Sequence, residues 1–177
     1  MRKVLRFILI FVLILLVASW AIPVAYGQTN GDTKPAGVSV EAAPIANAPA
    51  VSFIGNAIGG VTAGDLFYIN STSSPIDMSV DLYITNSDEL IHHLRYLILK
   101  VAVYVEGIDG QWQPITSMDG MVVPDTYITL KNSPVTFILP GTARYKVAIE
   151  SGSYYCLPFH SNSGEIAPQF YLNVEPI

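Results

Sequence analysis

Residues 76–85 read IDMSVDLYIT, and their alternation is the clearest structural signal in the chain. Apolar side chains occupy every second position from Ile76 to Ile84, and the positions between them hold Asp, Ser and Tyr. Successive side chains of a β-strand point to opposite faces of a sheet. The stretch is therefore expected to form a strand with one face in a hydrophobic core and the other in water.

Similar strand signals follow this stretch along the chain, with turn signals between them. Gly107–Gly110 is expected to be a hairpin loop, and Pro140-Gly141 is expected to be a turn. The predicted strands cover residues 96–105, 111–116, 126–130, 135–139, 144–150, 154–157 and 170–174. Many short strands with short connections indicate an all-β protein, an antiparallel β-sandwich of jelly-roll or immunoglobulin-like topology.

Three shorter stretches are expected to depart from simple strands. Ala50–Gly64 reads AVSFIGNAIGGVTAG and predicts a first strand that runs into a glycine-rich turn. Ser87-Asp88-Glu89 combines a capping residue with acids and predicts one or two turns of helix. Ser151-Gly152-Ser153 is expected to separate the strands on either side of it.

The composition limits the classes of function. Charged residues make up 13% of the chain, about half the usual share, and the formal net charge is −5. The absence of a basic stripe argues against nucleic-acid binding. The single cysteine, Cys156, excludes an internal disulfide. Cys156 is expected to be a buried small hydrophobe, and the alternative is an intermolecular disulfide.

Residues 1–27 are expected to be a secretory signal peptide. Arg2, Lys3 and Arg6 form a positive segment, Phe7–Ala18 is an uninterrupted apolar run, and Ala25-Tyr26-Gly27 offers a cleavage site before Gln28. The mature protein would then be secreted, extracellular or at the cell surface, with no further contact with the membrane. The alternative is that residues 7–26, which are just long enough to span a bilayer, stay as a membrane anchor.

Residues 28–50 are expected to form an N-terminal arm, ahead of a sandwich domain that covers residues 51–177. The arm is small, polar and interrupted by prolines, so it cannot bury enough apolar surface to fold alone. Its few larger apolar residues are Val38, Val40 and Ile45. These residues are candidates for a donor strand, one that adds to the sheet of a neighbouring subunit. Head-to-tail donation would give a homopolymer, because such contacts do not close on themselves.

No catalytic motif is recognisable in the sequence, and it predicts no enzyme activity, cofactor or metal site. There is no nucleophile elbow, HExxH motif, phosphate loop or EF-hand spacing. The adjacent His92 and His93 diverge on a strand or a helix, and are expected to be surface residues at a corner. Asn70-Ser71-Thr72 is the one N-glycosylation sequon, so Asn70 is a candidate glycosylation site.

The order of these segments resembles a known group of proteins. Phe53-Ile54-Gly55 leads to Gly60–Asp65, a polar spacer follows, and the strand Ile76–Ile84 then ends at Asn86-Ser87. This resembles the TasA/camelysin group of secreted biofilm matrix proteins, including archaeal bundling-pilus subunits, over residues 51–105. The resemblance implies a jelly-roll-like domain, no enzymatic site, and fibres assembled by donor-strand complementation through the N-terminal arm.

Two functional interpretations follow. The first is a structural subunit of an extracellular filament, pilus or biofilm matrix, whose partner is another copy of itself and whose filaments can bundle laterally. The second is a monomeric cell-surface module that binds a carbohydrate or another ligand. In the second interpretation Trp112, Tyr154 and Tyr155 are the candidate stacking residues.

Overall fold

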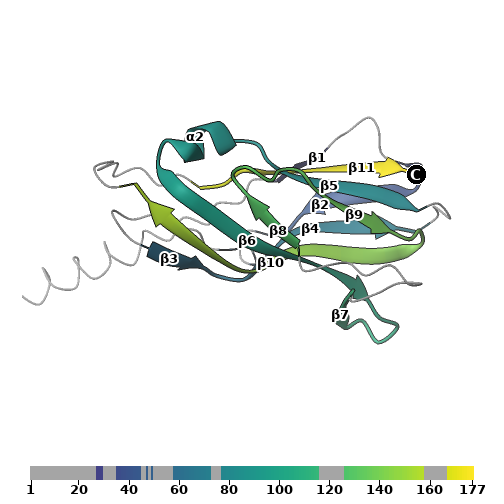
Figure 1. Cartoon of the computed structure of the whole chain (residues 1–177). Helices are drawn as coiled ribbons and strands as arrows, with labels where there is room; N and C mark the ends of the chain where they lie inside the picture. The colour runs from purple at the N-terminus through teal and green to yellow at the C-terminus, as the bar shows by residue number, and fades with distance from the viewer. Residues whose placement is uncertain are drawn as a thin grey trace, which may run out of the picture.

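The protein is an all-β sandwich, as the sequence predicts, with two sheets packed face to face (Figure 1). Strand pairing is antiparallel in both sheets except at one edge. In this computed structural model of the 177-residue chain, the described residues are 27–29, 35–44, 47, 49, 58–72, 77–115, 126–157 and 167–177.

The smaller sheet is built around two strands that the alternating sequence predicts. Its order is β1-β11-β5-β9, and β1 pairs with β11 in parallel, which the sequence pattern does not predict. The strands are β1 (Gly27–Thr29), β11 (Phe170–Pro176), β5 (Met78–Ile84) and β9 (Val135–Leu139).

The larger sheet has the order β2-β4-β10-β6-β7, with β3 also paired to β10 and β8 also paired to β6. The two long strands β10 and β6 lie at its centre, and β7 returns beside β6 after the hairpin at residues 107–111 (Figure 1). The strands are β2 (Val38–Ala42), β3 (Ile58–Val61), β4 (Gly64–Ser71), β6 (Leu94–Glu106), β7 (Trp112–Pro114), β8 (Thr126–Thr129) and β10 (Ala143–Cys156).

The hydrophobic core lies between the two sheets and confirms the alternation seen in the sequence. Along β5 every second side chain is buried, from Met78 to Ile84, and the side chains between them are partly exposed. The residues expected to face the core along 144–150, Tyr145, Val147 and Ile149, are buried, and Ala148 between the last two is buried as well. Cys156 is buried as well, in agreement with the interpretation of this residue as a small hydrophobe.

The glycine-rich turn predicted within residues 50–64 is wrong for its described part. Gly59 and Gly60 lie inside β3, which pairs with β10, and Gly64 begins β4 on the same side of β10. Glycine is needed at position 59 for space, since a Cβ atom there would overlap the ring of Tyr154. The first part of the predicted strand, residues 50–57, lies outside the described residues.

The break predicted at Ser151-Gly152-Ser153 is also wrong, because β10 runs through it without ending. The register shifts between Ile149 and Ser151, so the stretch is an irregularity within one long strand. A Cβ atom at Gly152 would lie 2.6 Å from Leu99 Cδ2 and 2.9 Å from the carbonyl oxygen of Ile98. This glycine therefore permits close approach of β6 and does not form a turn.

The predicted short helix is present as α2 (Ser87–Ile91), with Asp88 and Glu89 in its first turn. Its N-cap is Asn86, and the side chain of Asn86 does not cap the helix. Asn86 Nδ2 donates to the carbonyl of Ala167 (2.9 Å), and Asn86 Oδ1 accepts from the backbone N–H of Gln169 (2.8 Å). Asn86 therefore holds the segment that leads into β11.

Candidate functional site

The strand β2 occupies one edge of the larger sheet and contains two of the three donor-strand candidates. It pairs with β4 of its own chain, from Val38 opposite Ser71 to Ala42 opposite Phe67. Val40 is buried against the core, with 8% of its surface exposed, and Val38 is half-buried. The third candidate, Ile45, lies outside the described residues.

The N-terminal segment contributes to both layers along one side of the sandwich. β1 forms the edge of the smaller sheet beside β11, and β2 forms the edge of the larger sheet beside β4. The ladder of β2 extends by one bond, from the Ala43 N–H to the carbonyl of Leu66 (2.8 Å). Backbone edges that would otherwise be open for pairing are therefore covered by a segment close to the N-terminus.

The attachment of β2 depends mainly on its backbone. A fully buried valine contributes at most about 1.5–3 kcal/mol to stability, and Val38 contributes less than Val40 because it is only partly buried. Ordering the five residues of β2 costs about 1–2 kcal/mol each. The hydrogen bonds of the backbone ladder must offset the part of the entropy cost that the valines do not, at about 0.5–1.5 kcal/mol per hydrogen bond. β2 is therefore expected to open locally far more easily than the central strands.

Asn70 lies in β4, on the outward face of the larger sheet, between Ser39 of β2 and Arg144 of β10. The residue is half-buried, and no described residue donates a hydrogen bond to its buried Oδ1 atom. An attached glycan would have to leave the sheet between β2 and β10. Glycosylation of Asn70 stays a prediction.

A polar and aromatic cluster covers the same outward face nearer the middle of the sheet. Lys146 of β10 lies between Tyr104 of β6 and Tyr68 of β4 in the strand register. Its Nζ atom is 3.1 Å from Asp65 Oδ1, and it lies 4.8 Å from the centre of the Tyr104 ring and 5.3 Å from a Trp112 ring. Lys146 is thus held by one carboxylate and two aromatic rings.

Further contacts tie this cluster together. The Tyr68 hydroxyl donates to Asp65 Oδ2 (2.7 Å), and the Tyr68 ring packs against Trp112 with centroids 5.8 Å apart. The Tyr104 hydroxyl donates to Glu150 Oε1 (2.8 Å). Burial and this hydrogen bond raise the pKa of Tyr104 to about 12. The hydroxyl therefore stays protonated at neutral pH and acts as a donor to Glu150.

A hollow of about 380 Å³ opens beside this cluster. Ala148 lies opposite Asp65 and Ala102 in the strand register. The small side chains of Ala148 and Ala102 therefore lie between longer side chains on this face. The hollow is lined by Ala63, Gly64, Asp65, Tyr104, Lys146, Ala148, Ile149 and Glu150. Hydrogen-bonding groups and an aromatic ring thus surround a floor of small residues.

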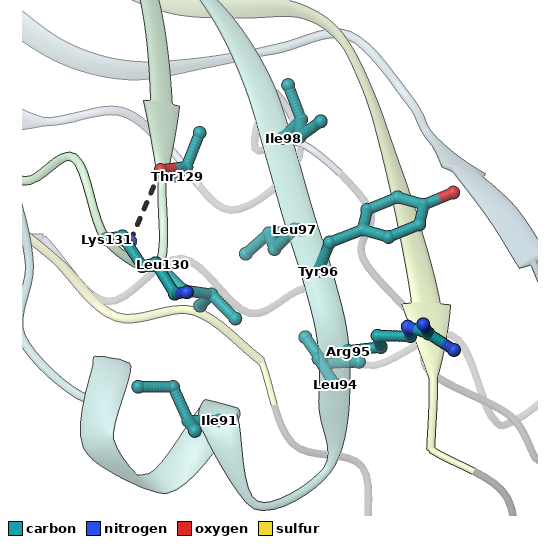
Figure 2. Close-up of a pocket in the computed structure, with 9 residues that line it drawn as sticks. All are labelled: Ile91, Leu94, Arg95, Tyr96, Leu97, Ile98, Thr129, Leu130 and Lys131. Atoms are coloured by element: carbon teal, nitrogen blue, oxygen red, sulfur yellow. Dashed lines mark hydrogen bonds between the residues drawn. The ribbon is translucent and has the colours of Figure 1, made fainter.

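A second hollow, of about 320 Å³, is mainly apolar and lies near α2. Figure 2 shows Ile91, Leu97 and Leu130 around one space between α2, β6 and the end of β8. Ile91 and Ile98 are 45% and 39% exposed, which leaves hydrophobic surface in contact with water. Arg95 and Lys131 lie at the same hollow. The lining offers no arrangement of polar groups that would define a ligand.

The candidate stacking residues Trp112, Tyr154 and Tyr155 are not brought together. Tyr154 is buried beneath Gly59, and Tyr155 lies opposite Tyr96 near the start of β6. Trp112 lies opposite Glu106 at the other end of β6, ten residues away and therefore about 33 Å along the strand. The sequence could have indicated Lys146 and Glu150 in place of the two tyrosines, because they occupy outward positions of an alternating strand.

Two of the three histidines lie at the corner that follows α2. His92 is exposed just after α2 and His93 is half-buried, which agrees with the prediction of a surface corner. Among the residues that the structure describes, no cluster of three His, Cys, Asp or Glu side chains is arranged to hold a metal ion.

The chain matches no known family model and no curated protein. In the described ranges, no helix is both long and apolar enough to cross a membrane.

Proposed function

We propose that the protein is a non-enzymatic structural subunit of an extracellular filament or biofilm matrix, in which neighbouring subunits exchange the strand β2. The observation that carries the proposal is the position of β2. It comes from the N-terminal arm, pairs along a single edge and buries one valine, Val40, against the core. In the filament, β2 of one subunit takes the place beside β4 of the next, with the same register and the same contacts.

The covalent connection allows this exchange. Fifteen residues separate Ala42 at the end of β2 from Ile58 at the start of β3. Such a segment reaches about 50 Å when extended, at 3.3–3.6 Å per residue. The strand β2 makes the same interactions with β4 of a neighbour as with β4 of its own chain. The free energy of exchange is therefore set by the connecting segment and by additional interactions between subunits.

A disulfide trap tests the exchange directly. Ser39 and Asn70 are register partners on the outward face, and antiparallel partners have Cα atoms about 4.5–5.5 Å apart, as a disulfide requires. Ser39→Cys with Asn70→Cys is introduced into protein that lacks residues 1–27, with Cys156→Ala to remove the native thiol. After assembly and oxidation, strand exchange gives a covalent ladder on non-reducing gels that collapses with reductant.

The control pair is Asn70→Cys with Arg144→Cys, two register partners that lie in β4 and β10 and not in the arm. This pair is expected to cross-link only within one chain. Electron microscopy on the same samples shows whether filaments form. Filaments whose Ser39–Asn70 cross-links are all intramolecular would exclude exchange of β2, and protein that stays monomeric under all conditions would exclude the filament itself.

A further inference from the structure

The outward face of the larger sheet carries a hollow that the proposed filament does not use. Its walls combine the ring of Tyr104, the ammonium of Lys146 and the carboxylates of Asp65 and Glu150, and its floor includes Ala148. Ligand sites typically combine apolar surface with a few convergent polar groups, in volumes from about 300 Å³. The hollow, at about 380 Å³, has room for one small ligand unit.

The charges in and around the hollow are balanced. Asp65 is paired with Lys146 at 3.1 Å, and Glu150 is paired with Lys100 at 3.1 Å. Two negative and two positive groups leave no net charge to attract an anion or a cation. A neutral ligand that both donates and accepts hydrogen bonds suits such an arrangement, because it needs no charged partner of its own.

The groups that line the hollow are held in place before any ligand arrives. Asp65 accepts from the Tyr68 hydroxyl and pairs with Lys146, and a carboxylate has about four acceptor positions, so it can accept further bonds. The Tyr104 ring is fixed through its hydroxyl bond to Glu150. Preorganised polar groups lower the entropy cost of binding.

We propose that this hollow binds a neutral, polyhydroxylated ligand, specifically a sugar unit of an oligosaccharide. The C–H face of the sugar lies against the Tyr104 ring and over Ala148, and its hydroxyl groups bond to Asp65, Lys146 and Glu150. Such a site would let the protein hold a neutral glycan on the face of the larger sheet. The proposal does not depend on strand exchange, because none of these residues belongs to β2.

Tryptophan fluorescence provides the test. Removal of residues 1–27 eliminates Trp20 and leaves Trp112 as the only tryptophan. Trp112 lies beside Lys146, which lines the hollow. Protein without residues 1–27, which retains every described residue except Gly27, is titrated with neutral di- and tetrasaccharides of glucose, galactose and N-acetylglucosamine, and with an oligouronate. We expect a saturable change with at least one neutral sugar and weaker binding of the oligouronate.

Three variants relate any binding to the hollow. Ala148→Leu fills the floor and is expected to weaken binding at least about tenfold, since the added side chain takes up the ligand space. Tyr104→Phe keeps the ring, removes the bond to Glu150, and is expected to weaken binding about three- to tenfold, the effect of one hydrogen bond. Ser79 lies on the smaller sheet, away from the hollow. Ser79→Leu is therefore the control and is expected to leave the affinity unchanged.

The folding measurements and the sugar titrations together decide whether the proposal holds. Thermal unfolding of each variant shows whether it is folded, and Tyr104→Phe keeps the test valid if Ala148→Leu does not fold. No saturable response to any neutral sugar would overturn the proposal, as would tighter binding of the oligouronate. Binding that is unchanged in both Ala148→Leu and Tyr104→Phe would place the sugar elsewhere and overturn it too.

Discussion

At the scale of single residues, position 59 requires glycine because the Tyr154 ring packs directly against it. The Tyr154 ring occupies the space where a Cβ atom at position 59 would stand. We expect Gly59→Ala to lower the free energy of unfolding by about 1–3 kcal/mol, the usual cost of overpacking. Chemical denaturation measures the change. Gly60→Ala is the control, since its Cβ would meet only the Gly152 carbonyl oxygen at an ordinary 3.7 Å, and an equal loss in both variants would contradict the role of the ring.

Among the residues that the structure describes, Tyr145 is the largest fully buried side chain, and its hydroxyl donates to the carbonyl of Pro140 at 2.6 Å. We expect Tyr145→Phe to lower the free energy of unfolding by about 0.5–1.5 kcal/mol, the net value of one hydrogen bond. Chemical denaturation again provides the measurement. Tyr127→Phe, at an exposed position, is expected to change little. A Tyr145→Phe protein as stable as the wild type would show that this bond does not contribute.

At the scale of elements, the side chain of Asn86 bonds to the segment that leads into β11, together with the neighbouring Thr85. Asn86 bonds to the backbone of both Ala167 and Gln169. We expect Asn86→Ala to remove these bonds and to lower the free energy of unfolding by about 1–3 kcal/mol. Hydrogen exchange should show the loss of protection first at the start of β11, from Phe170, and not in β6. Uniform loss across both strands would contradict a local role for Asn86.

Elements with regular alternation could be predicted from the sequence, and those that depend on close packing could not. The strands β5 and β11 are half-buried, so their apolar residues recur with period two. Gly59 and Gly152 are of the residue type that is common in turns, but here the two glycines give space to the Tyr154 ring and to β6. Their role depends on which strand lies opposite, and a single sequence does not contain that information.

The candidate site was less predictable for the same reason. Asp65, Tyr104 and Lys146 come from three different strands and meet only through the registers of β10 with β4 and β6. The alternation at 144–150 places Lys146 outward, but it does not show that aromatic rings surround it. The parallel pairing of β1 with β11 was also unpredictable, because three residues are too short for a pattern.

At the scale of the whole molecule, one buried tyrosine, Tyr145, and one partly buried tyrosine, Tyr104, are expected to lower the stability at alkaline pH. Burial raises the pKa of Tyr145 and of Tyr104 from 10.0 to about 12. In the unfolded chain both groups lose their protons near pH 10, while the folded protein keeps them. Stability is therefore fully present below pH 10 and falls between about pH 10 and pH 12. Urea denaturation as a function of pH measures this, and Tyr145→Phe should make the decline shallower. A flat profile would contradict the assignment.

The ladder between β2 and β4 also has a mechanical consequence for a filament built by exchange of β2. The five residue pairs of this ladder lie along the strand axis. Tension applied along that axis loads all the hydrogen bonds of the ladder at once, so they must yield together. A force that peels β2 sideways loads them one after another. A joint of this design would therefore resist a pull along β2 much better than a force that peels β2 away from β4.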